Sequence, residues 1–414
     1  MRVRAVTVGW TVEWRSGRIV NAGECAGIAE RIRESFARRG FELQTVRLAT
    51  QPFAGIVPPD AVVDFARELC AMAGAAGFDY VAMGPVAPHQ GSWIPAMVSA
   101  LVANEALFAA VSVTGDDGEV SLAAVGLAGE TIAELARRTE RGFGNLRFAA
   151  LAACPPGIPF FPAAYHDGGS LALSVAWEIA DEVGAAFAGV ASLAEAKRRL
   201  EERLTARAEE LRAAAEELAD DLSGRFLGID CSLAPFPEAE RSVAGAFERL
   251  GVRPFGGPGT LAVASLVTEA LRGLPVPQTG FCGLMVPVLE DSRLAELARA
   301  GRLSLVTLLA ASAVCGVGLD VVPLPGDVRP AQLSAVILDV ATLAVRLGKP
   351  LVARLMPIPG ARAGDAVRFD FPFFAPAAAL PVEGEVPPDW FASGSGQSTG
   401  SSGGKSGGNG EPVA

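Results

Sequence analysis

Histidine and paired cysteine are scarce in this sequence, and each scarcity excludes a class of site. Only two histidines, His89 and His166, occur in 414 residues, so a metal site would depend mainly on carboxylate or thiolate ligands. The six cysteines are scattered without a C-x-x-C pair, and no signal-peptide pattern opens the chain. Reduced thiols in a cytoplasmic protein are therefore expected.

Clustered positive charge and long apolar runs are also missing. The formal net charge is −11, and no Lys/Arg cluster is interleaved with aromatic residues. This composition argues against binding to nucleic acids or to anionic membranes. No apolar run is expected to span a bilayer. Half of the residues are hydrophobic, which is enough for a large buried core, and a small molecule is the expected partner.

The order of apolar segments predicts an α/β protein with roughly ten short strands, most of them separated by helices. Residues 170–187 are interpreted as a buried helix. Residues 2–8 and 41–48 alternate, whereas most of the strands, among them residues 226–230, 319–324 and 350–356, are nearly uniformly apolar. Such strands are typical of a parallel sheet covered on both faces or of a closed barrel.

Two further segments stand out by composition. Residues 192–222 predict a long amphipathic helix that begins with the capping box of Ser192 and Glu195. Its leucine stripe, which includes Leu204 and Leu211, either lies across the domain or pairs with a second copy in a homodimer or higher oligomer. Residues 1–380 are expected to form one domain, and the Gly/Ser-rich residues 381–414 a disordered tail.

Several segments resemble one family of proteins. They are NLRFAALAACPPGIPFFPAAYH (145–166), GIDCSLAPFPEAERS (228–242), TGFCGLMVPVLED (279–291), VCGVGLDVVPLPGD (314–327) and GDAVRFDFPFFA (364–375). Together they resemble the uncharacterised "PFL family proteins", domain-of-unknown-function family 711, also known as uncharacterised protein family 0210. The resemblance covers residues 1–375.

This resemblance implies a ten-stranded α/β barrel like that of pyruvate formate-lyase and the ribonucleotide reductase large subunit. In those enzymes a loop threads the barrel and carries a radical cysteine. The irregular apolar run 281–289 is either a strand or such a loop, in which case Cys282 would take the cysteine's place. The glycyl-radical signature and adjacent cysteines are both absent, so the resemblance implies an architecture, and the chemistry must be argued from the site.

Residues 312–327 (SAVCGVGLDVVPLPGD) are interpreted as the rim of the working site. Cys315 lies among glycines, which let the backbone approach a ligand closely. Its thiol is interpreted in one of two ways: it is a reactive group, as a nucleophile or radical carrier, or it is a small buried hydrophobic group. Asp320 begins a strand, where a charge suggests acid–base work or a metal ligand. Asp230 ends another strand. His166 and Tyr165, in a proline-braced loop, either form a pocket wall with a general acid or base or are structural.

A second group of residues suggests a site for an anion. Gly257, Gly259 and Thr260 precede a helix, whose free N–H groups favour negative charge. Arg147 and Arg354 are single charges on apolar strands, and each either pairs with an internal carboxylate or binds an anionic ligand. Glu290-Asp291 after the apolar run is interpreted as the solvated start of a helix.

The resulting hypothesis is an enzyme that acts on a small anionic metabolite at the carboxyl ends of the barrel strands, without glycyl-radical chemistry. Cys315, His166, Asp320 and Asp230 form the expected catalytic group, and no cofactor or metal is indicated by a motif. The alternatives are a non-catalytic small-molecule sensor on the same fold and a scaffold that uses the long helix as its contact surface.

Overall fold

A computed structural model describes residues 1–391 and confirms the α/β class. Nine strands form one mixed sheet in the order β10-β11-β7-β6-β5-β4-β1-β8-β9. They are β1 (Arg2–Gly9), β4 (Glu42–Ala49), β5 (Tyr80–Val86), β6 (Leu107–Ser112), β7 (Phe148–Ala152), β8 (Ala172–Glu178), β9 (Arg225–Asp230), β10 (Gly318–Pro325) and β11 (Leu351–Ile358). Two small hairpins, β2 (Trp14–Arg15) with β3 (Arg18–Ile19) and β12 (Ala366–Val367) with β13 (Ala377–Ala378), lie outside this sheet.

Strand direction changes at two places in the sheet. The middle strands β7, β6, β5, β4 and β1 are parallel to one another. The pair β8 and β9 is antiparallel to β1, and the pair β10 and β11 is antiparallel to β7. The amino-terminal ends of the middle strands therefore lie at the same end of the sheet as the carboxyl ends of both outer pairs.

Residues 277–288 run as an irregular segment between β9 and β10. On one side Leu233, just after β9, donates its N–H to the carbonyl of Gly283, and on the other Gly316, just before β10, donates to that of Leu284. A parallel bridge also joins Ile229 to Gln278. Pro287 lacks an N–H, which explains why this segment has no regular ladder. The segment connects strands that stand at opposite ends of the strand order.

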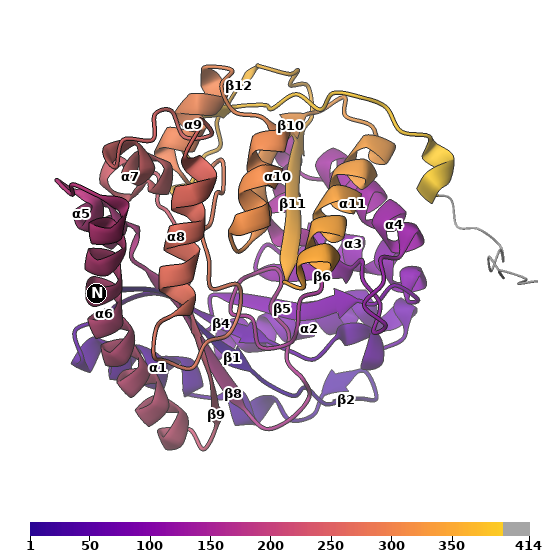
Figure 1. Ribbon diagram of the computed structural model, residues 1–414. Coiled ribbons are helices and arrows are strands. Elements are labelled where there is room, and N and C mark those ends of the chain that lie inside the picture. Colours follow the sequence, from indigo (N-terminus) through magenta and orange to yellow (C-terminus); the bar gives the residue numbers. More distant parts are fainter. Residues whose placement is uncertain (392–414) are drawn as a thin grey trace, which may run out of the picture.

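The helices surround the strands, as Figure 1 shows. Alternate strand residues such as Val46, Leu48 and Val81 point into this helical layer and form the main core with it. The helices are α1 (Ile28–Arg38), α2 (Val62–Ala75), α3 (Ile94–Ala103), α4 (Leu122–Arg138), α5 (Ala180–Phe187), α6 (Leu193–Asp221), α7 (Val243–Arg249), α8 (Thr260–Arg272), α9 (Ser292–Arg299), α10 (Leu305–Val314) and α11 (Pro330–Leu347).

The long amphipathic helix is α6, and its predicted start is confirmed. The hydroxyl of Ser192 accepts the N–H of Glu195 at 3.1 Å, whereas the carboxylate of Glu195 accepts the N–H of Ala191, so only one half of the predicted capping box forms. In the stripe, Leu204 and Leu211 are fully buried and Leu193 is exposed, and α6 packs on α5 and α8. This buried part of the stripe is therefore covered within the chain, so it offers no contact surface for a scaffold, and pairing with a second copy stays untested.

The prediction of a helix over residues 170–187 is wrong in its first half. That half forms strand β8, which pairs antiparallel along the whole of β1, and only the second half is helical in α5. A short apolar run has no periodicity that separates a buried strand from a buried helix. The hydrogen-bonding edge of β1, which is a tertiary feature, decides the outcome.

Helix α11 is long and apolar enough, by length and composition, to cross a membrane, although the sequence analysis expected no such run. It packs against α4, β11 and β7, and it carries Asp339 and Arg346. These contacts are those of a helix that packs on a sheet.

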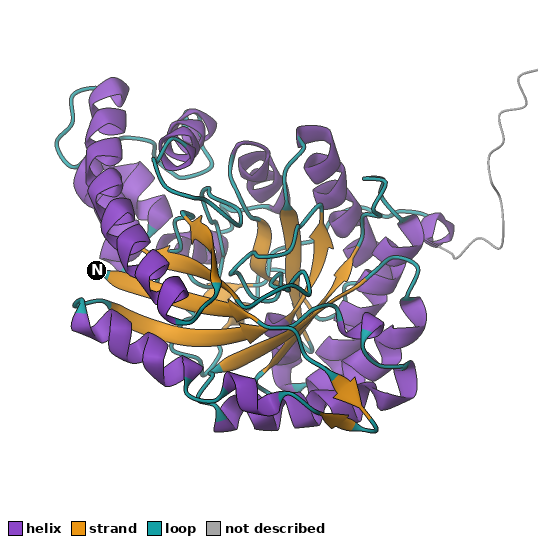
Figure 2. Ribbon diagram, turned by 90° about the horizontal axis from the view of Figure 1, so that it is seen from below, coloured by secondary structure: helices purple, strands orange, loops and turns teal. Residues whose placement is uncertain are grey.

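The inner face of the middle strands carries small residues, which alternate along each strand with the residues that point into the helical layer. They include Ala49, Ala82, Ala110 and Ala149. The space that these alanines leave is filled by residues 153–169, with Ile158, Phe161 and Ala163 packed against them. In Figure 2, loop segments lie between the strands on the left and those on the right.

Residues 381–391, which were expected to belong to the tail, lie along the helices. Phe391 is buried against Gly126 of α4, and Gln332 of α11 donates hydrogen bonds to the carbonyls of Val382 and Gly384. The rest of the predicted tail, 392–414, lies outside the described residues.

Candidate functional site

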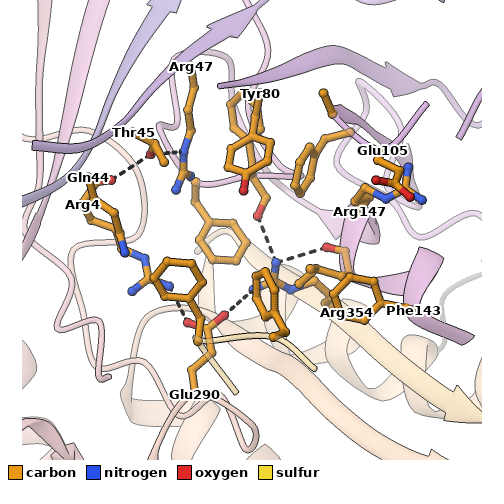
Figure 3. A pocket seen from close by; sticks show the side chains of 17 residues that line it. Arg4, Gln44, Thr45, Arg47, Tyr80, Glu105, Phe143, Arg147, Glu290 and Arg354 are labelled. Carbon is orange, nitrogen blue, oxygen red and sulfur yellow. Dashed lines mark hydrogen bonds and ion pairs between the residues drawn. The ribbon is translucent and has the colours of Figure 1, made fainter. Parts of the chain in front are cut away.

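A cavity of about 490 Å³ opens on the inner face of the sheet, at the amino-terminal ends of the middle strands. Figure 3 shows its side chains pointing toward one another. Its polar lining consists of Arg4, Gln44, Thr45, Arg47, Tyr80, Glu105, Arg147, Glu290 and Arg354, and its apolar lining of Ala106, Phe108, Phe143, Leu146, Phe160, Phe161, Phe371 and Phe373. Its volume lies in the range of small-ligand sites. The hypothesis expected a site at the carboxyl ends of strands, and for the middle strands the cavity lies at the opposite end.

Two of the arginines share one glutamate. Arg4 of β1 contacts Glu290 through Nη2 and Oε2 at 2.5 Å and also Glu178 at 3.5 Å. Arg354 of β11 contacts the second oxygen of Glu290 at 3.5 Å and Asp320 through Nε and Oδ1 at 2.5 Å. Burial raises the pKa of Asp320, while the adjacent guanidinium of Arg354 opposes that rise. The positive charges of Arg4 and Arg354 are thus compensated within the chain.

Arg147 is satisfied by a helix end. Its Nη1 donates to the carbonyls of Leu101 at 2.6 Å and of Asn104, at the carboxyl end of α3. Cations are favourable there because the last carbonyls of a helix carry partial negative charge. Arg147 lines the cavity, but its hydrogen bonds hold α3 against the start of β7.

Arg47 of β4 differs from the other three arginines. Its Nε donates to the hydroxyl of Thr45 at 2.9 Å, and its guanidinium lies 5.3 Å from the ring centre of Phe161. Within residues 1–391 its guanidinium forms no ion pair, and its two Nη groups donate no hydrogen bond. Burial, with the nearby charge of Arg4 as the second cause, lowers the pKa of Arg47 to about 9. A cation placed in this way is costly unless a ligand supplies the missing negative charge.

Aromatic rings form a continuous wall beside Arg47. Phe161 packs on Phe108 with ring centres 5.2 Å apart, and Phe108 packs on Tyr80 at 5.4 Å. On the other side, Arg354 lies 5.0 Å from the ring centre of Phe160. Figure 3 shows Tyr80 next to Arg47 in the cavity.

The tip of the loop 153–169 builds part of this wall. Thr7 of β1 donates its hydroxyl to the carbonyl of Pro159, and Arg354 donates to that of Phe161 at 3.3 Å. These hydrogen bonds hold the loop between β1 and β11, which stand apart in the strand order. The two residues of this loop that line the cavity are Phe160 and Phe161. No cysteine is among the lining residues.

The structure does not bring the expected catalytic group together in this cavity. Cys315 lies fully buried at the end of α10, where burial raises the pKa of its thiol to about 11. His166 lies against Gly9, its backbone N–H donates to Thr50, and both of these neighbours stand at carboxyl ends of middle strands. Among the described residues no hydrogen bond or ion pair joins Cys315, His166 or Asp320 to another of the three. Asp320 lies behind Arg354 and does not line the cavity.

Asp230 holds the irregular segment 277–288. Its carboxylate accepts the N–H groups of Ser232, Phe281 and Cys282 at 3.0 to 3.2 Å. Burial raises the pKa of Asp230, and these hydrogen bonds oppose the rise. The thiol of Cys282 accepts the N–H of Cys231 at 3.4 Å. These contacts tie the segment to β9, away from the cavity lining.

The remaining predicted ligand residues also lie outside the cavity. Thr260 accepts the N–H of Gly256 through its hydroxyl at 2.9 Å, and Gly257 donates to the carbonyl of Pro254. Gly259 is the residue before α8, and its positive φ of 94° makes the turn into that helix. Two polar groups of this loop are thus used within the loop itself.

Tyr165 is likewise engaged within its own loop. Its hydroxyl donates to the carbonyl of Cys154 at 3.0 Å, and burial raises the pKa of Tyr165 to about 12. Arg147 and Arg354 are the two predicted ligand-binding residues that line the cavity, where Arg354 pairs with Asp320.

Sequence reasoning overlooked Arg4, Arg47, Tyr80 and the role of Glu290. The signal that singled out Arg147 and Arg354 was one charge on an apolar strand. It does not single out Arg4 or Arg47, because residues 2–8 also carry Arg2 and residues 41–48 also carry Glu42. Asp291 does start α9, because it accepts the N–H groups of Arg293 and Leu294, but the expectation of a solvated start is wrong, since Asp291 is fully buried. Its neighbour Glu290 instead turns inward.

The fold and the cavity define an α/β protein with an arginine- and phenylalanine-lined pocket on the inner face of its sheet. A family model described as "Uncharacterised ACR (DUF711)" matches residues 1–375. The chain belongs to this family, and the resemblance seen in the sequence is confirmed to that extent.

Curated relatives agree with this assignment. A UPF0210 protein of Pyrobaculum islandicum is 33% identical over 350 residues, which cover 80% of this chain and 76% of the relative. One of Desulforudis audaxviator is 32% identical over 374 residues, which cover 84% and 80%. One of Leuconostoc citreum is 29% identical over 376 residues, which cover 84% and 80%. None of these names states an activity.

Proposed function

We propose that this protein binds a small organic anion in the cavity, with Arg47 as the residue that pairs with the anionic group. The observation that carries the proposal is the guanidinium of Arg47, which lines the cavity without a carboxylate partner in residues 1–391. The Nη groups of a guanidinium form a planar fork that matches carboxylate and phosphate oxygens. Folding that leaves such a group unpaired has a cost, which a bound anion would offset.

The test is a thermal-shift screen of small organic acids against the wild type, Arg47→Gln and Arg346→Gln. Arg346 is an exposed residue of α11 without an ion pair in the described part of the chain, so its replacement gives the same change of charge away from the cavity. Acids that stabilise the wild type and Arg346→Gln, but not Arg47→Gln, support the proposal. A set of acids that stabilises all three proteins equally contradicts it.

Catalysis on the bound anion is the second candidate, because acid–base groups share the cavity. The carboxylate of Glu290 and the hydroxyl of Tyr80 both line it. Acids that stabilise the protein would be incubated with the wild type and with Glu290→Gln, and their conversion followed by mass spectrometry. Conversion by the wild type alone supports an enzyme. An intact ligand after incubation with the wild type supports the sensor or binding protein.

The barrel, too, is a proposal. The hydrogen bonds of residues 277–288 to β9 on one side and to the start of β10 on the other support closure of the nine strands into a ten-stranded ring. The kinship with pyruvate formate-lyase would then concern architecture. The free state of all six cysteines is compatible with a cytoplasmic protein. A homo-oligomer stays a prediction, which light scattering on the purified chain would test.

A further inference from the structure

The charges around the cavity specify more than an anion. Three carboxylates, those of Glu290, Glu178 and Asp320, compensate three arginines, because Arg4 and Arg354 share them with Arg241, which pairs with Glu178. Arg147 donates to carbonyls at the end of α3, and the nearby carboxylate of Glu105, which also lines the cavity, offsets its charge. One positive charge, that of Arg47, is left over. One negative charge on the ligand balances it, whereas a second would face Glu290 without a free cation nearby.

The surroundings of Arg47 specify the body of the ligand. An oxygen pair held by the Nη groups of Arg47 lies beside the rings of Phe161, Phe108 and Tyr80, which pack edge to face with one another. Aromatic rings pack best with another ring in offset or edge-on geometry. A flat unsaturated body attached directly to the anionic group fits this wall better than a puckered aliphatic one.

We infer that the ligand is a planar, aromatic or conjugated monocarboxylate, with its carboxylate on the fork of Arg47 and its flat body against Phe108 and Phe161. This inference rests on the proposed function, because it assigns a ligand class to the same pocket. It adds two separate requirements: a single negative charge and a planar body.

The test uses the full-length protein and three commercially available probes at pH 8 in isothermal titration calorimetry. Benzoate is a planar monoanion. Cyclohexanecarboxylate keeps the charge but is puckered, and phenyl phosphate keeps the ring but is a dianion, since the second pKa of a phosphate ester is near 6. Benzoate is expected to bind about threefold or more tightly than cyclohexanecarboxylate. It is also expected to bind about fivefold or more tightly than phenyl phosphate, because the second charge has no partner.

The outcomes separate the planar body, the single charge and the role of Arg47. Equal affinity for cyclohexanecarboxylate overturns the planar body, and equal or higher affinity for phenyl phosphate overturns the single charge. In both cases a loss of binding in Arg47→Gln, with binding retained in Arg346→Gln, leaves the proposed function intact. Benzoate binding that persists unchanged in Arg47→Gln, or no binding of any probe to the wild type, overturns the inference. Persistence in Arg47→Gln also removes the proposed role of Arg47.

Discussion

Replacing Arg47 by methionine is expected to stabilise the ligand-free protein, which is the reverse of what loss of a structural arginine would do. Arg47 is half-buried in the cavity and next to the positive charge of Arg4, and both causes lower its pKa to about 9. The folded state thus holds this cation at a cost. Methionine has a similar reach, carries no charge and adapts to irregular apolar surroundings.

The magnitude follows from the pKa of Arg47. The fall of this pKa from its ordinary value to about 9 amounts to at most roughly 4–5 kcal/mol of differential free energy, at about 1.4 kcal/mol per tenfold change in proton affinity. Water that enters the cavity reduces this cost. The variant also loses the contact with Phe161, worth about 0.5–1 kcal/mol, and the hydrogen bond to Thr45, worth about 1 kcal/mol. A net gain of about 1–2 kcal/mol in the free energy of unfolding remains.

Differential scanning calorimetry measures this gain. At roughly 2–4 °C per kcal/mol for a domain of this class, Tm should rise by about 2–8 °C in Arg47→Met. The matched control is Arg354→Met, which should lose about 3–5 kcal/mol because Asp320 and Glu290 are left without their partner.

The pH dependence of the difference provides a second readout. Because the folded pKa of Arg47 lies below its unfolded value, the unfolded state holds more protons between pH 9 and the unfolded pKa. The cost is therefore fully present below pH 9 and declines as the pH rises above it, so the advantage of Arg47→Met should shrink. A variant that melts below the wild type, as Arg354→Met is expected to do, would refute the view of Arg47 as an unpaired cation.

Three further predictions concern buried groups outside the cavity lining. Asp291→Ala should lower the free energy of unfolding by about 4 kcal/mol in urea titration, because the carboxylate of Asp291 caps α9 and also accepts the N–H groups of Val243 and Ala244 in α7. Asp291→Asn should lose less of this free energy. An equal loss in the two variants would show that charge alone matters. Lys349→Met should cost about 2 kcal/mol, because Nζ donates to carbonyls at the end of α10; an unchanged urea midpoint would contradict this cap. Burial raises the pKa of Cys25 to about 12, so the unfolded state loses this proton first and stability should fall as the pH rises from about 9 to 12; Cys25→Ala should show a shallower fall between pH 8 and 10.5, and an identical slope would exclude the thiol as a cause.

Local features of the chain determined the parts of the fold that depend on near neighbours. The helix start at Ser192, the apolar stripe of α6 and the start of α9 at Asp291 all form, because each depends on residues within one or two helical turns. The strands of uniformly apolar residues were recognisable for a similar reason, since burial on both faces demands that composition. The family, too, followed from continuous segments of sequence.

The tertiary structure alone decided which side chains share the cavity. Strand residues alternate between two faces, so the inward position of Arg47, and of Tyr80 beside it, depends on register and on which strands are neighbours. Strand β8 forms because residues 172–178 pair with the edge of β1, and the loop tip with Phe161 is held by hydrogen bonds from strands far apart in the chain. Cys315 and His166 had suitable chemistry in sequence, but the fold buried each in its own surroundings. Pairing of distant segments leaves no trace in local composition, and for that reason the unpaired arginine could be found only in three dimensions.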